Sequence, residues 1–562
     1  MRKTIFILAT FLAYNIIIAA DPVSVPQDNP VYRFLDRMET LGIIANIRDG
    51  AKPFDRGRIA LLLREIDLKR DLLIKIDRQQ LENHLLDFRY EIDRQIQYAQ
   101  LQEGRTWYTP FSSFKQLKTD FLRFFQRAHP EEDNHVFLWE DSTNSFYFDF
   151  IADFYYDKRD DQKSRSANTQ IYRLRGTIAE NFGYALDLAL VAIRGDEGYR
   201  ESHPVLKDTW NQTSNGKIYF DRSGGELAYH TKYIDFRFAQ QPITWGLGES
   251  GRLILSDYCE QYTYFNISKH WKWGTFTFIH GKLLEESALD SIDDQPIHPH
   301  KWIAAHRFEF SPWHWMSVGL TEMVIYGNRS PEWAYFIPFN FYRATEHNLR
   351  DRDNLLIAID IEANILAGSK IYGTIMLDEF KQSKLFSDWW GNKFAYHLGY
   401  HLVDPFGLPN LSLRFEYAAI RPWVYTHIFK VNRYINYTHS LGHWAGPNSQ
   451  VIYINLEKDW HWRFITGLRF TQFKHGDNYP NENIGGNILL GHNILLGEQE
   501  EARETSKFLE GILTTDNIIE LFTRYEVFNN LFLQFSMAHR NSRIQDHTTN
   551  LMIYQFGFRL DY

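Results

Sequence analysis

Charged residues of both signs recur at a spacing of two in the C-terminal three quarters of the chain. Arg307 and Glu309 form one such pair, Arg414 and Glu416 form another, and a third set falls within residues 520–526. In a β-strand this spacing places each set on one face. Such a face has two possible uses: a lattice of ion pairs that stiffens a wall, or a polar surface whose carboxylates and guanidinium groups bind sugar hydroxyls. The sequence alone leaves both uses open.

Signals for catalysis and metal binding are weak. The chain lacks G-x-S-x-G and H-E-x-x-H motifs, and the separation of the carboxylates Glu309 and Glu322 cannot be read from sequence. His397 and His401 would lie about 13 Å apart on a strand, at ~3.3 Å per residue, too far to share a metal ion. Cys259 is the only cysteine, which excludes a cysteine-based metal site and an intramolecular disulfide. We therefore predict no enzyme activity, no metal and no cofactor.

The elements that position these side chains alternate with a period of two from about residue 145. In residues 354–364 the isoleucines share one parity, and Asp360 and Glu362 share the other. Each such segment is about ten residues long, as tilted transmembrane strands are. The alternation recurs around residues 371–378, 394–402, 411–417, 452–454, 464–468 and 521–525. Glu322 breaks the pattern by sharing the apolar parity of its strand, which requires a bulge, a loop position or a different register.

Composition narrows the class of protein. The 562 residues include 16 Trp, 32 Tyr and 43 Phe, yet the mean hydropathy is only −0.41 and the net charge is −9. So many large rings exclude a disordered chain. After residue 20 no apolar run approaches the ~18 residues of a spanning helix, and the net acidity argues against nucleic acid as a partner. Apolar rings facing lipid around a polar interior would give this balance.

The size of the predicted barrel follows from its length. About 420 residues from 145 to 562, at roughly 23 residues per strand and connection, allow about 18 strands. A lumen of that width is too wide for side chains alone to fill. A soluble β-sandwich or propeller would also alternate, but the girdle-like Tyr and Phe content and a terminal strand ending on an aromatic residue favour the membrane barrel.

The N-terminal part has a different organisation. Residues 1–20 predict an export signal, with Arg2 and Lys3 before an apolar stretch and Ala19-Ala20 at its end. Residues 21–105 predict a bundle of three short helices, either a plug or docking module or a periplasmic cap without activity. Residues 106–144 are ambiguous, and residues 145–562 form the predicted barrel.

Several strings in order resemble the Wzi family of capsule-assembly outer-membrane proteins. They begin with PVYRFLDRMETLGII and KPFDRGRIALLL in the helical region and continue through PITWGLGESGRLILS at residues 242–256. AHRFEFSPWHWMSVGLTEMVIYG at residues 305–327, DNLLIAIDIE, RPWVYTH at residues 421–427 and LGHWAGPNS at residues 441–449 complete the series. Residues 478–506 are similar to an enlarged loop on that framework.

The resemblance implies an outer-membrane all-β barrel of about 18 antiparallel strands with a small N-terminal α-helical bundle in the periplasm. It also implies a lectin-like role without catalysis, in which loops at the cell surface hold capsular polysaccharide or exopolysaccharide. The other partners it implies are outer-membrane lipid and the barrel-assembly machinery. The glycan-binding candidates within the strings are Trp245, Glu249, Arg252, Arg307, Glu309, Glu322, Arg421, Tyr425, His427 and His443.

Two other hypotheses remain open at this point. The predicted diameter suits an outer-membrane pore for small solutes or saccharides. A pair of carboxylates such as Glu309 and Glu322 would serve an outer-membrane hydrolase. From the residues alone, the Trp245-Gly246 sequence predicts a tight turn with an exposed ring.

Overall fold

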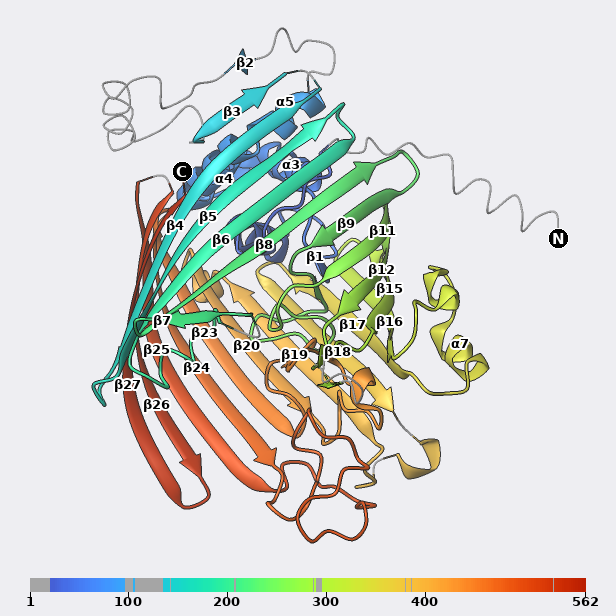
Figure 1. Cartoon of the computed structure of the whole chain (residues 1–562). Coiled ribbons are helices and arrows are strands. Elements are labelled where there is room, and N and C mark those ends of the chain that lie inside the picture. The colour runs from blue at the N-terminus through green and yellow to red at the C-terminus, as the bar shows by residue number, and fades with distance from the viewer. Residues whose placement is uncertain are drawn as a thin grey trace, which may run out of the picture.

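The C-terminal three quarters of the chain form a closed antiparallel β-barrel in the computed structural model (Figure 1). The structure describes residues 21–96, 105–106, 135–141, 143–206, 209–286, 288–289, 296–379, 381–385, 387–528 and 530–561. Eighteen strands of this described part make the wall. The sheet closes where β27 pairs with β4, from Ile553 opposite Arg159 to Asp561 opposite Ile151. The predicted fold class and strand number are confirmed.

The wall follows the chain order without crossovers. Its strands are β4 (Ser145–Arg159), β5 (Ser164–Ile178), β6 (Phe182–Gly195), β8 (Lys217–His230), β9 (Asp235–Gln240), β11 (Thr263–Trp271), β12 (Gly274–Leu283), β15 (Lys301–Trp313), β16 (Met316–Gly327), β17 (Asn354–Leu366), β18 (Ser369–Glu379), β19 (Lys393–Val403), β20 (Leu411–Ile420), β23 (Ser449–His461), β24 (Phe464–Asp477), β25 (Ile512–Phe528), β26 (Leu531–Ile544) and β27 (His547–Asp561). Shorter strands are β1 (Ala51–Lys52), β2 (Arg105–Thr106), β3 (Phe137–Glu140), β7 (Gln212–Ser214), β10 (Thr244–Trp245), β13 (Ala288–Leu289), β14 (Pro296–Ile297), β21 (Ile435–Asn436) and β22 (His439–Ser440).

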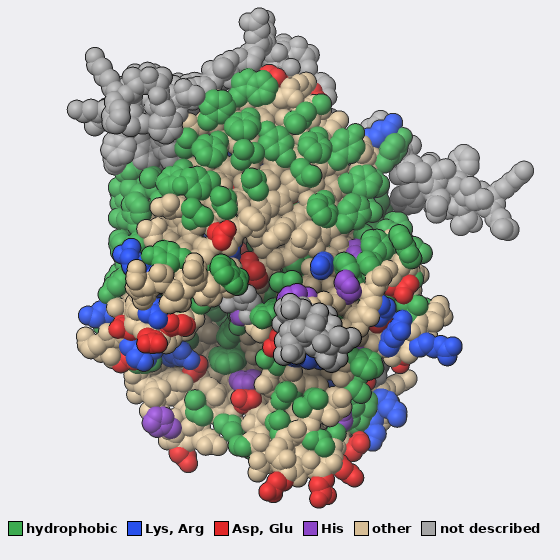
Figure 2. All heavy atoms as spheres, viewed as in Figure 1, with side chains coloured by type: hydrophobic (Ala, Val, Ile, Leu, Met, Phe, Trp, Pro, Cys, Tyr) green, Lys and Arg blue, Asp and Glu red, His purple; other side chains and the backbone are tan. Residues whose placement is uncertain are grey.

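The period-two pattern places apolar side chains outside and charged ones inside. On β17, Ile359 and Ile361 are exposed on the outer face, whereas Asp360 and Glu362 between them are buried inside. Figure 2 shows hydrophobic side chains over the upper part of the visible face, and charged and histidine side chains over the lower part. The outward apolar band is what a barrel that crosses a membrane requires.

The two ends of the barrel differ in their connections. One end has short turns, such as residues 272–273 and 314–315, and the other has long connections, such as residues 421–448 and 478–511. We call the end with the short turns the short-turn end. Its hairpins carry stacked tryptophan pairs. Ring centroids lie 5.9 Å apart for Trp271 with Trp273 and 5.5 Å apart for Trp313 with Trp315. Such rings suit the boundary between lipid and water.

Helices occupy the N-terminal region. They are α2 (Val31–Thr40), α3 (Arg56–Asp67), α4 (Lys75–Asp87) and α5 (Arg89–Ile96), with a short 3₁₀ turn at Arg70–Leu72. The connections of the barrel contain one further helix, α7 (Tyr342–Asn348), and 3₁₀ turns at Trp333–Phe336 (η2), Gln382–Lys384, Pro405–Gly407 and Lys430–Asn432. Three helices are predicted between residues 21 and 105, but the structure has two helices, α4 and α5, in place of the third. The chain leaves helical geometry at Phe88 (φ −106°, ψ 19°), whose ring is fully buried. Among the described residues no helix has both the length and the apolar character to cross a membrane.

The N-terminal helical segment lies at the short-turn end and contacts the inner wall on several sides (Figure 1). Its residues 21–55 bind side chains of β8, β9, β17, β18, β20, β23 and β27. β1 also pairs with β10, which belongs to the connection at residues 241–262. Because its contacts lie all around the barrel, this segment extends across the lumen.

The alternation predicts a lumen that is polar along its whole length, but the structure shows a lumen that is polar only in part. Near the long connections, the inward positions of the strands are apolar, as at Ile303, Ile325 and Leu356. They pack with residues 253–255 and Tyr425 from connections that fold inward. The prediction is wrong for this half of the lumen because inward-folded connections need apolar partners.

Two predicted regions fall wholly or partly outside the described residues. The export signal at residues 1–20 is one of them. Most of the ambiguous stretch at residues 106–144 is the other, of which the structure describes Thr106, β3 and a few neighbours.

His84 provides a test of the helical bundle. Its imidazole is buried against the Phe34 ring of α2 at 5.1 Å, and burial lowers its pKa to about 4. A folded-state pKa below the unfolded value of ~6.5 gives stability that is complete above pH 6.5 and is lost as pH falls toward 4. Protonation of His84 at pH 4.5 should therefore weaken the bundle by roughly 2–3 kcal/mol.

The measurement is limited proteolysis of the helical segment at pH 7 and pH 4.5. His84→Phe should lose much of the acid-induced increase in cleavage, whereas the same change at the exposed His347 should not. Equal pH dependence in wild type and His84→Phe would contradict the assignment.

Candidate functional site

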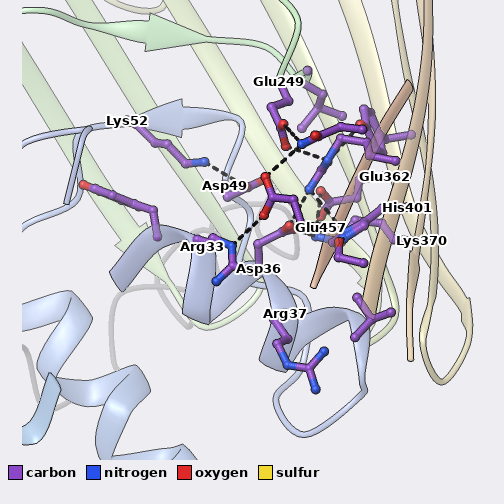
Figure 3. A pocket seen from close by; sticks show the side chains of 18 of the residues that line it. Arg33, Asp36, Arg37, Asp49, Lys52, Glu249, Glu362, Lys370, His401 and Glu457 are labelled. Atoms are coloured by element: carbon purple, nitrogen blue, oxygen red, sulfur yellow. Dashed lines mark hydrogen bonds and ion pairs between the residues drawn. The ribbon is translucent and has the colours of Figure 1, made fainter. Parts of the chain in front are cut away.

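A cavity of about 480 Å³ lies inside the barrel between α2, the connection at residues 241–262 and the inner wall. Charged side chains of both signs line it, as Figure 3 shows. The inward parities of β17, β18, β19, β20 and β23 supply the wall side. The cavity is therefore the place where the polar parity of the strands meets the N-terminal segment.

Lys370 of β18 is the central cation. Its ammonium lies 2.8 Å from Asp36 and 2.5 Å from Glu39, both on α2, and 3.3 Å from Glu362 of β17. The Asn46 side-chain amide donates to the same Glu362 carboxylate at 2.6 Å. Lys370 is almost fully buried, so one cation here binds three carboxylates away from water.

Asp36 connects this group to the next two strands, β19 and β20. Its second oxygen accepts from the Arg414 guanidinium at 2.7 Å and lies 3.2 Å from Nδ1 of His401. Burial would raise the pKa of Asp36, but the cations around it, led by Lys370, outweigh burial and hold the pKa well below its usual range. Asp36 therefore stays ionised inside the barrel.

The inward connection is fixed to the wall by a second set of polar contacts. Glu416 of β20 accepts the backbone N–H groups of Glu249 and Ser250 at 2.8 and 2.7 Å. Glu249 in turn accepts from the Tyr453 hydroxyl at 2.6 Å and pairs with Arg414 at 2.8 Å. Gly248 (φ +128°) lies in this turn, where a Cβ atom would approach the His397 ring at 2.7 Å. The turn thus requires glycine at residue 248.

The opposite side of α2 is anchored in the same way. Arg33 pairs with Glu457 at 3.0 Å and with Asp459 at 2.5 Å, both on β23. Arg37 binds Asp77 of α4 at 2.8 Å and Asp404 of the β19–β20 turn at 3.0 Å. One helix therefore carries ion pairs to β18, β20, β23 and a turn of the wall. This arrangement acts first as an electrostatic lock between plug and wall.

Two of the predicted site residues, Glu249 and Arg252, line the cavity. Trp245 and Tyr425 are buried in the apolar layer beneath it, and His443 is buried against the Trp444 ring. The Tyr425 hydroxyl donates to the Leu253 carbonyl at 2.8 Å. The prediction of an exposed Trp245 ring is wrong, because the ring is 1% exposed. Its strand pairs with β1, so the inward-folded connection encloses it.

Arg307 and Glu309 belong to a separate buried cluster on the inner wall. The Arg307 guanidinium binds Glu309 at 2.9 Å, Asp360 of β17 at 2.6 Å and the Thr321 hydroxyl at 2.9 Å. Arg307 has no exposed surface. These residues form a structural ion-pair group with no surface for a ligand.

Glu322 lies on the outer face of the wall. β16 needs neither a bulge nor a shifted register at this position, since Glu322 pairs regularly with His306 and Ile357. The explanations predicted from parity are therefore wrong. The carboxylate is buried because residues 328–353 fold over it from outside. Glu309 and Glu322 thus lie on opposite faces of the sheet, where they cannot act as a catalytic pair.

Arg421 and His427 lie at the end with the long connections, together with a ring cluster. Trp390 stacks on His492 with centroids 3.6 Å apart, and Trp423 meets the same imidazole edge-on at 5.1 Å. The Arg421 guanidinium lies 5.0 Å from the Phe394 ring centroid. Trp390, His492, Arg421 and His427 are all partly exposed. We call Trp389, Trp390, Arg421, His427 and His492 the outer ring cluster.

The period-two pattern indicates the strands that form the cavity but does not select their central residues. Lys370, His401 and Arg414 all lie on the polar parity that the sequence defines. Their partner Asp36 lies on a helix more than 330 residues away, and nothing local to either segment predicts the pairing. Within the described part of the chain, no group of three or more His, Cys, Asp or Glu side chains is arranged to hold a metal ion.

Lys370→Met tests the lock. It leaves the buried carboxylates of Glu39 and Glu362 without their cation, whereas Asp36 keeps Arg414, and this should destabilise the protein by about 3–5 kcal/mol. It should also expose residues 21–55 to protease. Unfolding in detergent by denaturant or heat gives the first quantity, and mapped tryptic cleavage gives the second.

The matched control is Lys69→Met, which removes a half-exposed pair with Glu65 and a hydrogen bond to the Ile43 carbonyl and should cost about 1 kcal/mol or less. Adding Glu362→Met to Lys370→Met should recover part of the loss. Equal stability of the Lys370 and Lys69 variants would disprove the central role of Lys370.

Comparisons with known proteins agree with this architecture. A family profile described as capsule assembly protein Wzi matches residues 159–550. The solved structure of Wzi from Escherichia coli, described as an outer-membrane protein involved in group 1 capsule assembly and a carbohydrate-binding β-barrel, is 14% identical. The match covers 96% of this chain and 99% of that one with a TM-score of 0.55, which shows a shared fold. OprD from Pseudomonas aeruginosa gives 9% identity and a TM-score of 0.43 over 74% of this chain and 95% of that one.

No curated protein matches the chain. The family match alone covers well over half of the residues. The chain belongs to the Wzi family of capsule assembly proteins.

Proposed function

We propose that this protein is an outer-membrane, lectin-like barrel that binds surface polysaccharide and helps to assemble or attach capsule. Membership of the family supports the assembly role. The carbohydrate binding described for the E. coli structure supports the ligand class. The observation that carries the proposal is the outer ring cluster at the end with the long connections.

The chemistry of this cluster suits a sugar. Aromatic faces pack against the C–H faces of pyranose rings, while guanidinium, imidazole and amide groups bind hydroxyls, and binding sites combine these two elements. Trp389 and Trp390 offer partly exposed rings, and Arg421 and His427, also partly exposed, lie in the connection at residues 421–448 at the same end of the barrel. Of the residues predicted from the sequence, Arg421 and His427 are thus the ones we assign to glycan binding.

The orientation follows from the two ends. In barrels of this class the turns that face the periplasm are short and the loops that face outward are long. We therefore place the helical bundle on the periplasmic side and the outer ring cluster at the cell surface. Residues 1–20 would direct export, and the barrel-assembly machinery and membrane lipid would be further partners. We assign no reaction, metal or cofactor to the chain.

Trp390→Ala and Arg421→Ala should each weaken binding of purified capsular polysaccharide about tenfold, which is ~1.4 kcal/mol, since each removes either a stacking face or a hydroxyl ligand. Binding is measured with the full chain in detergent. The ratio of cell-bound to shed polysaccharide is measured in a capsulated strain. The control is Trp460→Ala, an exposed ring near the short-turn end. Unchanged binding in both variants, with folding intact, would refute the assignment.

The alternative of an open pore makes a different prediction. Residues 21–55 and 241–262 lie across the lumen and are bound to the wall by ion pairs and an apolar layer. Planar bilayers containing the protein should therefore show no large steady conductance. Lys370→Met should raise the frequency of brief openings. A large open current in the wild type would favour a transport function instead.

A further inference from the structure

The connection between β16 and β17 does not project away from the barrel mouth like a simple loop. Residues 328–353, which contain η2 and α7, fold back over the outer surface of the wall (Figure 1). We call this segment the outer lobe. It covers a surface that the strand alternation would otherwise leave facing lipid.

The contact between outer lobe and wall is extensive and apolar. Tyr335 and Tyr342 of the lobe have no exposed surface. They pack with outward-facing residues of the wall, including Phe278, Val324 and Tyr326. The lobe is therefore a fixed part of the fold.

The polar contacts locate the lobe in depth. Glu322 accepts the backbone N–H groups of Tyr342 and Arg343, each at 2.8 Å. In the ladder Glu322 lies opposite Ile357, and Ile357 lies opposite Leu377 on the next strand. Glu322 thus occupies an outward row whose members on β17 and β18 are apolar, while His306 of β15, its neighbour on the other side, lies 3.3 Å from the carboxylate. The outer lobe therefore lies at the depth of these apolar residues, where its backbone N–H groups supply the donors that the buried carboxylate needs.

The surface that the lobe presents outward is unusual. Residues 333–341 (WAYFIPFNF) contain no charged side chain. Trp333 is 81% exposed and Phe339 78%, and Ile337 and Phe341 are also exposed. Phe339 in addition stacks on the outward Phe276 of β12, with centroids 4.5 Å apart. A continuous aromatic patch of this kind marks a contact with another apolar phase.

The charged residues of the lobe lie at its margins. Arg329 is bound to Asp353 at 2.6 Å, on the side where the strands end. Arg343, Arg350 and Arg352 follow the aromatic stretch and are exposed. Arg343 lies 3.5 Å from Glu346, and the exposed Asp351 lies between the other two arginines. Aromatic residues followed by arginines are the arrangement of a segment that inserts rings among acyl chains and places cations at anionic headgroups.

We propose that the outer lobe is a lipid-binding element inserted in the outer half of the bilayer. Its residues 333–341 contact acyl chains, and Arg343, Arg350 and Arg352 bind the phosphates of an anionic lipid. Continuity with the outward apolar band argues for lipid over a protein partner, because the same rows of the wall face lipid on β18 and β19. This inference does not depend on glycan binding.

The experiment uses depth-dependent quenching on the full chain. Cys259 is the only cysteine, so a Cys259→Ala background allows single labels with an environment-sensitive fluorophore at Phe339→Cys and, independently, at Trp333→Cys. Leu320→Cys on the outward wall is the lipid reference, and Glu500→Cys in an exposed connection is the water reference. Vesicles are phosphatidylcholine with or without phosphatidylglycerol.

Nitroxide-labelled acyl chains should quench labels at residues 339 and 333 as strongly as at 320, and iodide should quench them several-fold less than at 500. Iodide quenching equal to that at residue 500, without quenching from lipid, would overturn the proposal. Labels that are open to iodide in vesicles but shielded from both quenchers in isolated outer membranes would overturn it too, in favour of a protein partner.

The headgroup part is tested separately. Phosphatidylglycerol should increase lipid quenching at residue 339 in the parent protein. The increase should disappear when Arg343, Arg350 and Arg352 are all changed to Gln, while the acyl-chain quenching persists. If phosphatidylglycerol has no effect in the parent, the three arginines do not bind lipid phosphate.

Discussion

Closure of the sheet between β4 and β27 is the constraint on which the rest of the structure depends. A closed sheet leaves no unpaired strand edge, which is what allows strands to cross a membrane. Closure also fixes one inward and one outward face for every strand, since alternate side chains point to opposite sides. The separation of the outward isoleucines of β17 from the inward Asp360 and Glu362 is a direct result.

A barrel of eighteen strands has a wide interior, and in this protein two different layers of side chains fill it. Near the short turns the filling is ionic, organised around Lys370 and Arg414. Near the long connections it is apolar, built from inward-folded segments on Ile303, Ile325 and Leu356. The ionic layer holds the helical bundle, which has its own hydrophobic core, to the wall, and the apolar layer lies beneath the outer ring cluster.

The fold could be predicted largely from sequence, because the alternation of apolar and polar residues within each strand shows which face of that strand points to lipid and which to the lumen. The site could be predicted only in part. A string that resembles the family contains Glu249 and Arg252, but the ion pair of Lys370 with Asp36 joins segments with unrelated local patterns. The burial of Trp245 depends on a connection folding inward, which no periodicity records. Glu322 differs from these residues, because its charge on the apolar parity is visible in the sequence. It marks the place where residues 328–353 cover the outer face of the wall.

The ion pair of Asp28 with Arg559 spans 531 residues of sequence. One partner lies near the start of the described chain and the other on its last strand, so this contact cannot form until the whole wall is in place. The loop it closes is nearly as long as the chain, and such contacts are entropically the slowest to form. The contacts of residues 21–55 with the wall are therefore complete only once the last strand, β27, has joined it.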